Sequence, residues 1–75
     1  MTTPTDRSIL IHLLTVGNDA PANIAESVGT APEYVNERLR ELKEKGLVVS
    51  RGSGVWALTS DGIAVARAAY RESDT

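Results

Sequence analysis

The side chains that could carry out chemistry are few in this chain, and they are not grouped as catalysis or metal binding requires. The only histidine, His12, stands between Leu10 and Leu13, and cysteine is absent. A transition-metal site would need carboxylates as its other ligands, and the sequence holds no suitable cluster. No Ser, Thr or Asp is spaced to pair with His12 as a nucleophile, and the glycine-rich residues 52–54 lack the helix start of a phosphate loop. We therefore expect no enzymatic activity, no metal and no cofactor, and we interpret His12 as a partly exposed surface residue.

Binding of a polyanion or of another protein is the chemistry that remains, and the charge of the chain limits it to local patches. The sequence has 8 Lys+Arg against 10 Asp+Glu, which gives a net charge of −2. Bulk attraction to nucleic acid needs a basic surface, so any such binding must rest on a few side chains. Arginine outnumbers lysine, a composition that hints at a halophilic or high-GC source.

Length and hydropathy predict one small domain without a membrane span. A chain of 75 residues buries roughly 60% of its unfolded surface, so its core must be thin. The longest apolar stretch, residues 9–14, is interrupted by His12 and is too short to span a membrane or to form a signal peptide. We expect a single domain over residues 1–75, with its core at about 6–70, located in the cytoplasm.

Apolar spacing and helix-end residues predict three helices in the first part of the chain. We expect the first over about 6–15 and the second over about 21–28. Thr30 at the N-cap and Glu33 three residues later form a capping-box pattern. This pattern predicts a third helix that continues to about residue 45.

The pattern then changes from helical to strand-like. Two runs rich in β-branched residues, 47–51 and 55–58, flank a tight turn at 52–54 and predict a hairpin. Thr59 caps a last helix over about 60–72. The fold class is mainly α with a small β-hairpin, in the order helix, helix, helix, hairpin, helix. The predicted core consists of Ile9, Leu10, Leu13, Ile24, Val28, Val35, Leu39, Leu42, Leu47 and Leu58.

Two helices joined by a tight turn and followed by a hairpin are the arrangement of a winged helix-turn-helix. The motifs that carry the resemblance are Ile24-Ala25 with Val28-Gly29, Tyr34-Val35 with Arg38-Leu39 and Leu42, Gly46-Leu47-Val48, and Gly54 to Thr59 with Gly62. Together they resemble the winged helix-turn-helix of archaeal transcriptional regulators, most of all the haloarchaeal domains likened to the phi-H phage repressor. The resemblance covers about residues 6–70. It implies a transcriptional regulator that binds double-stranded DNA with its third helix in the major groove and its hairpin, the wing, against the backbone or minor groove.

Carried over residue by residue, the resemblance implies DNA contacts from the third helix and the wing. The candidates are Thr30, Pro32, Glu33, Tyr34, Asn36, Glu37 and Arg40 for the groove, Arg38 and Lys43 for phosphates, and Arg51 and Ser53 at the wing. Capping also explains Thr30 and Glu33, and packing beside the second helix also explains Tyr34. We expect Trp56 to seal the hairpin against the third helix rather than to stack on a base.

The charge of the third helix is a departure from this family pattern. Opposite Val35, the helical wheel places four acids and one arginine: Glu33, Glu37, Glu41, Glu44 and Arg40. One glutamate can accept a hydrogen bond from cytosine, but several acids facing a polyanion oppose binding. The alternative function is therefore a protein-interaction module whose glutamate face meets a basic partner.

The last helix carries a broader apolar surface than one core-facing stripe needs. Small Ala66 and Ala69 would let a partner helix approach closely, while Ile63 and Tyr70 would fill the ends of the contact. We therefore expect a homodimer through residues 60–72 that binds a pseudo-palindromic operator, because a single domain offers a small DNA interface. The alternative is that these residues only cover the core of their own chain.

Overall fold

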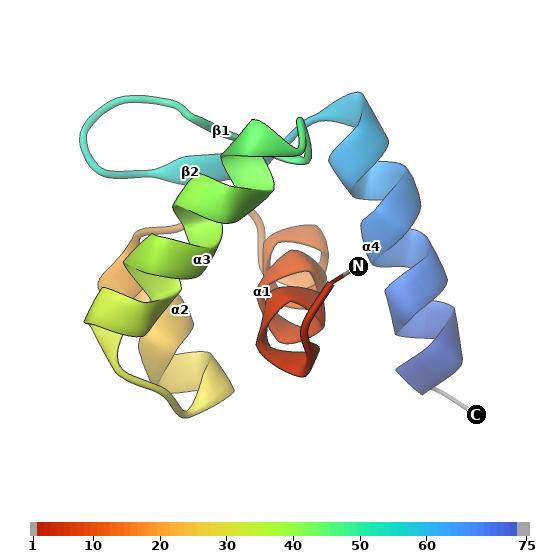
Figure 1. Ribbon diagram of the computed structural model, residues 1–75, viewed down its shortest axis with the longest axis horizontal. Coiled ribbons are helices and arrows are strands. Elements are labelled where there is room, and N and C mark those ends of the chain that lie inside the picture. Colours follow the sequence, from red (N-terminus) through yellow and green to blue (C-terminus); the bar gives the residue numbers. More distant parts are fainter. Residues whose placement is uncertain (1, 74–75) are drawn as a thin grey trace.

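The predicted order of elements is confirmed by the computed structural model, which describes residues 2–73 (Figure 1). Over that part of the chain, three helices are followed by an antiparallel two-stranded hairpin and a last helix. The elements are α1 (Pro4–Thr15), α2 (Pro21–Val28), α3 (Pro32–Glu44), β1 (Val48–Ser50), β2 (Trp56–Leu58) and α4 (Ser60–Ser73). None of the described helices is long and apolar enough to cross a membrane.

Helix α1 begins two residues before the predicted start at residue 6. Thr3 is its N-cap, and Pro4 occupies the first turn. The Thr3 hydroxyl accepts from the Asp6 backbone N–H at 3.0 Å, and the Asp6 carboxylate accepts from the Thr3 N–H at 3.1 Å. This reciprocal capping box satisfies two backbone donors that a helix start otherwise leaves without partners.

The capping box predicted at Thr30 is wrong. The N-cap of α3 is Ala31, and no side chain caps this helix. Thr30 instead belongs to the end of α2, because its N–H donates to the Ala25 carbonyl of that helix. Gly29, between α2 and Thr30, is the C-cap and has a left-handed φ of 74°. Pro32 fixes the boundary, since a proline ring holds the preceding residue in an extended conformation that suits an N-cap and not a helix interior.

The core lies between α1 and the elements that surround it. All predicted core residues are buried except Val28 and Leu58, which are partly buried and pack against the others. Helix α4 packs along α1 and contributes Ala66, which is completely buried. At its start, Thr59 accepts from the Gly62 N–H at 3.0 Å, as expected for the cap of α4.

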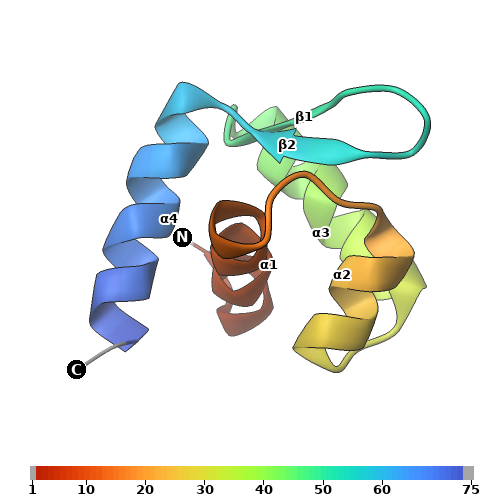
Figure 2. The ribbon, with the colours of Figure 1, turned by 180° about the vertical axis from the view of Figure 1, so that it is seen from behind.

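Both strands of the hairpin pack against helices, and β2 also pairs with the α1–α2 connection. Strand β1 packs against α3, whereas β2 packs mainly against α1 and α4. Trp56 in β2 is half-buried and packs against the core, but its strand contacts α1 and α4 more than α3, which is the helix predicted to receive it. From behind, Figure 2 shows the α1–α2 connection running beside β2, where Asp19 and Trp56 form an antiparallel bridge.

Candidate nucleic-acid interface

Helices α2 and α3 form a helix-turn-helix that presents the outer face of α3 to solvent. The two helices pack together and are joined by residues 29–31. The side chains of Val35, Leu39 and Leu42 point inward and are completely buried, which fixes the rotation of α3 about its axis. Every other residue of this helix is at least partly exposed.

Most of the side chains predicted to contact DNA lie on this outer face or at the hairpin tip. Tyr34 is 38% exposed, and Asn36, two residues further on, is half-buried. The remaining exposed candidates are Pro32, Glu33, Glu37, Arg40 and Lys43 on α3 and Arg51 and Ser53 on the hairpin, while Thr30 before α3 is half-buried. The structure thus leaves these residues at least partly exposed on α3, before it or on the hairpin.

Arg38 faces the interior and cannot hold a phosphate as predicted. Its Nε and Nη2 donate to the two carboxylate oxygens of Asp6 at 2.7 and 2.9 Å. The Asp6 side chain is 0% exposed, and that of Arg38 is 16% exposed. Burial by itself raises the pKa of the Asp6 carboxyl, but the hydrogen bonds from Arg38 and Thr3 and the charge of Arg38 outweigh it, so this pKa lies below its usual value. The hydrogen bond to Asp6 likewise raises the pKa of the Arg38 guanidinium.

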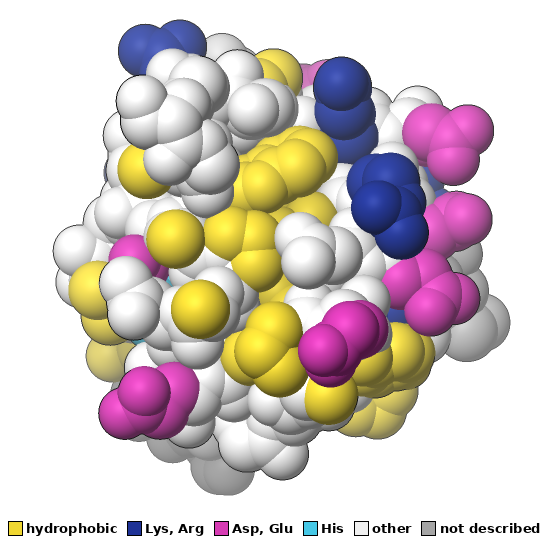
Figure 3. Space-filling view, turned by 90° about the vertical axis from the view of Figure 1, so that its left-hand side faces the viewer, with side chains coloured by type: hydrophobic (Ala, Val, Ile, Leu, Met, Phe, Trp, Pro, Cys, Tyr) yellow, Lys and Arg dark blue, Asp and Glu magenta, His cyan; other side chains and the backbone are white. Residues whose placement is uncertain are grey.

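The pairing of Arg38 leaves the outer face of α3 with more acid than base. Arg40 and Lys43 are its exposed cations, and they stand among four exposed glutamates, Glu33, Glu37, Glu41 and Glu44. Figure 3 shows the side of the molecule on which the hairpin loop and the α2–α3 corner lie. Basic side chains gather in the upper half of this view, and acidic ones line its right-hand edge. Any contact with phosphates is therefore confined to a part of the face.

The hairpin tip projects two polar side chains on a tight turn. The Arg51 N–H donates to the Val55 carbonyl at 2.8 Å, and the Val55 N–H donates to the Gly52 carbonyl at 3.0 Å. Ser53 has a φ of 52°, the left-handed conformation that side chains other than glycine seldom adopt, between two glycines of positive φ. The turn therefore holds the exposed side chains of Arg51 and Ser53 at the end of the wing.

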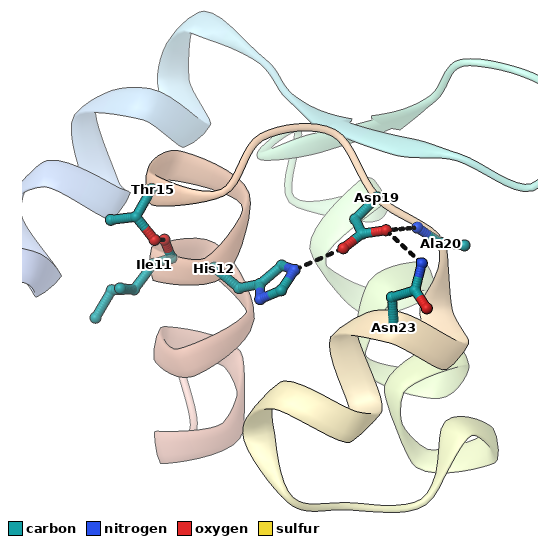
Figure 4. A network of polar contacts seen from close by, with 6 residues as sticks. All are labelled: Ile11, His12, Thr15, Asp19, Ala20 and Asn23. Carbon is teal, nitrogen blue, oxygen red and sulfur yellow. Dashed lines mark hydrogen bonds and ion pairs between the residues drawn. The ribbon is translucent and has the colours of Figure 1, made fainter.

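The prediction that His12 is a surface residue is wrong, because it belongs to a polar network that the sequence pattern did not indicate (Figure 4). His12 is 7% exposed, and its Nε2 lies 2.8 Å from Oδ2 of Asp19. The other carboxylate oxygen of Asp19 accepts from Nδ2 of Asn23 at 2.9 Å and from the Ala20 N–H at 2.8 Å. These hydrogen bonds, first that of Asn23 and then those of His12 and Ala20, lower the pKa of Asp19 to about 2.

Two of the residues predicted to form a dimer are not accessible on α4. Ala66 is 0% exposed and Ala69 is 4% exposed, because α4 packs along α1. A partner helix cannot reach them without unfolding this contact, so their assignment to a dimer surface is wrong. Ile63 is half-buried, and Tyr70 is 46% exposed.

Comparison with known proteins gives one family and a set of similar structures. Residues 2–49 match the family model for winged helix-turn-helix DNA-binding. No curated protein matches the chain. The chain is similar to Lactococcus lactis ZitR, wild type, with 30% identity and a TM-score of 0.89 over 99% of this chain and 52% of that one.

Two further structures extend this similarity. One is wild-type ZitR in complex with DNA, with 29% identity and a TM-score of 0.85 over 99% of this chain and 54% of that one. The other is the Mycobacterium tuberculosis MarR family protein Rv2887, with 28% identity and a TM-score of 0.84 over 93% of this chain and 53% of that one. The chain thus spans about half the length of these proteins.

Proposed function

The chain belongs to the winged helix-turn-helix DNA-binding family, and from this premise we infer that it is a sequence-specific transcriptional regulator of double-stranded DNA. The observation that carries this function is the exposed face of α3, which a buried stripe of three residues turns toward solvent, together with an exposed wing tip. A similar structure that holds DNA supports the same function. Such a protein would act in the cytoplasm, where the DNA is. The resemblance to phi-H-like domains supports its placement among the haloarchaeal repressors.

The outer side chains of α3 would read the major groove. Asn36 and Arg40 are the base readers, since an amide pairs with adenine and a guanidinium with guanine in a bidentate manner. Tyr34 and Thr30 flank them, and Glu37 can accept a hydrogen bond from a cytosine amino group. Lys43 on α3 and Arg51 with Ser53 on the wing would contact the phosphate backbone.

Fluorescence anisotropy with the DNA upstream of the protein's own gene tests this function. We expect saturable binding that weakens as salt rises. Arg40→Ala should lower the affinity at least about fivefold, the lower end for loss of a bidentate base contact. Arg67→Ala is the matched control, because Arg67 is exposed on α4 and its loss changes the net charge equally. Equal effects of the two substitutions would contradict a reading role for α3.

The acidic residues of α3 favour one competing function, the binding of a basic protein. Glu33, Glu37, Glu41 and Glu44 are all exposed, and together they repel a polyanion. The double substitution Glu37→Gln with Glu41→Gln separates the two functions. A DNA-binding protein should gain affinity for DNA when these charges are removed, whereas absence of saturable DNA binding at low salt by both parent and variant favours the basic partner.

We further propose that the chain binds a pseudo-palindromic operator as a homodimer. One domain buries about 600–1,000 Å² on DNA, which favours two copies for specific binding. With Ala66 and Ala69 buried, Tyr70 is the exposed residue of α4 best suited to a contact between copies. Light scattering measures this directly. A mass near 8.0 kDa for the protein alone at tens of micromolar, together with a mass of one chain added to that of the operator in the complex, would exclude the dimer.

A further inference from the structure

The wing is hydrogen-bonded to Asp19, which lies in the connection between α1 and α2, two residues before α2 begins. The Asp19 N–H donates to the Trp56 carbonyl at 3.1 Å, and the Trp56 N–H donates to the Asp19 carbonyl at 2.9 Å. This pair of hydrogen bonds occupies the edge of β2 that β1 does not use. Trp56 is the next residue after Val55, whose carbonyl accepts from Arg51 at the wing tip.

The side chain of Asp19 fixes this attachment point to two helices at once. One carboxylate oxygen contacts His12 of α1, and the other accepts from Asn23 of α2 and from the Ala20 N–H (Figure 4). The His12 side chain is 7% exposed and that of Asp19 is 19% exposed, so water competes little for the contact between these two side chains, whereas the contact with Asn23 is exposed. The side chain and backbone of one residue therefore join α1, α2 and β2.

The wing has few other constraints near its tip. Each of its strands has three residues, and the turn from Arg51 to Gly54 is exposed. A two-stranded hairpin of this size is marginally stable by itself, so its direction relative to α3 depends on its contacts with the rest of the molecule. Strand β2 packs against α1 and α4, and the bridge at Asp19 adds two backbone hydrogen bonds at Trp56, the end of β2 that lies next to the turn.

We propose that Asp19 is a positioning residue for DNA binding, which holds the wing so that Arg51 reaches the backbone while α3 lies in the groove. This inference rests on the proposed function. Asp19 does not contact DNA itself; it acts through the hairpin. His12 and Asn23 support it by holding the two carboxylate oxygens.

Loss of the Asp19 charge and loss of the Asp19 contacts should change the DNA affinity in opposite directions. Asp19→Ala and Asp19→Asn both remove one negative charge, and this alone strengthens binding to a polyanion. Asparagine keeps an oxygen for the Ala20 N–H and Asn23 and an amide that can donate to His12, whereas alanine keeps neither. We expect Asp19→Ala to weaken DNA binding at least about fivefold, with a salt slope lower by about one as a phosphate contact is lost. Asp19→Asn should bind at least as tightly as the parent.

A double-mutant cycle and amide exchange complete the test. In an Arg51→Ala background, Asp19→Ala should have less than about a twofold further effect, because the contact it positions is already absent. In the free protein, Asp19→Ala should accelerate exchange of the Trp56 and Arg51 amides at least about tenfold and leave the Leu39 amide unchanged. The inference is overturned if both Asp19 substitutions increase the DNA affinity equally. It is also overturned if Asp19→Ala weakens DNA binding as much in the Arg51→Ala background as in the parent.

DNA binding and amide exchange together distinguish a failure of the inference from a failure of the proposed function. If the parent binds no DNA, the proposed function fails and positioning for DNA fails with it. If the parent binds DNA but the hairpin amides of Asp19→Ala exchange as in the parent, only the positioning role is overturned. General unfolding is recognised because it would accelerate the Leu39 amide as well.

Discussion

Replacement of Arg38 by methionine should destabilise the fold although Arg38 lies on the helix assigned to DNA. Methionine keeps the length and apolar body of the side chain, so that the packing of the stem is largely retained. The two hydrogen bonds of 2.7 and 2.9 Å to Asp6 are lost. Asp6 remains completely buried, with the Thr3 N–H as its remaining hydrogen-bond donor.

The expected cost is a large part of the total stability. Removal of one partner from a buried ion pair costs about 3–5 kcal/mol, because the other charge stays buried. The Thr3 N–H still serves Asp6, so we take the lower end, about 3 kcal/mol. A domain of 75 residues has a free energy of unfolding of about 4–11 kcal/mol. Arg40→Met, at an exposed position two residues away, should change it by less than about 0.5 kcal/mol.

Urea unfolding followed by circular dichroism measures both variants. At pH 7 the midpoint of Arg38→Met should fall by about 3 M for an m-value of about 1 kcal/mol per M. The difference should shrink as the pH falls toward the usual Asp pKa of 3.8. In the parent, the lowered pKa of Asp6 gives stability that is present above this value and lost below it. In the variant, protonation neutralises the buried carboxylate. Equal midpoints for Arg38→Met and Arg40→Met at pH 7 would refute the assignment of Arg38 to the interior.

Three further predictions concern the core, helix α4 and Asp19. Leu39→Ala, at a 0% exposed position, should cost about 2–5 kcal/mol, and a melting temperature within a few degrees of the parent would contradict its central place. Ala66→Glu should unfold the chain, because it buries a charge against α1; it should not yield a folded monomer from a dimer. Ala68→Glu, at an exposed position of the same helix, is the control and should leave the melting curve unchanged. The lowered pKa of Asp19 gives stability that is lost as the pH falls from about 4 to about 2, so the difference in urea midpoint between the parent and Asp19→Asn should disappear in that range.

The buried stripe of α3 and the hairpin were predictable because they follow from local periodicity. Val35, Leu39 and Leu42 recur at the spacing of one helix face, and all three are completely buried. The turn at 52–54 separates two short runs of strand-forming residues, which do pair as predicted. In both cases, the information lies within a few residues of the chain.

The starts of α2 and α4 were predicted correctly, whereas those of α1 and α3 were predicted less well because the capping threonines Thr5 and Thr30 were given more weight than the prolines. Helices α1, α2 and α3 each have proline in the first turn, and the residue before that proline is the N-cap in all three. For α2 and α3 this residue is alanine, without a capping side chain. Proline fixes the boundary through its φ angle and its steric effect on the preceding residue, whatever the type of that residue.

The polar pairs could not be predicted because their partners are distant in the chain or belong to different elements. Asp6 and Arg38 are 32 positions apart, and no local pattern links them. His12 and Asp19 are 7 positions apart, but the turn between α1 and α2 decides whether they meet. Each of these side chains is also plausible at a surface, so residue type alone favours exposure.

The pairing of Arg38 changes how the chain can bind DNA. An arginine in the middle of α3 is engaged with Asp6, so the proposed cationic contacts with DNA are fewer: Arg40 to a base, and Lys43 and Arg51 to phosphates. Arg51 lies on the wing, and we have proposed that Asp19 holds the wing in position. On this proposal, DNA affinity would depend more on the placement of a few cations than on the total charge. A wing that moves freely would lose one of the three proposed cationic contacts, so the attachment of the hairpin would matter as much as the face of α3.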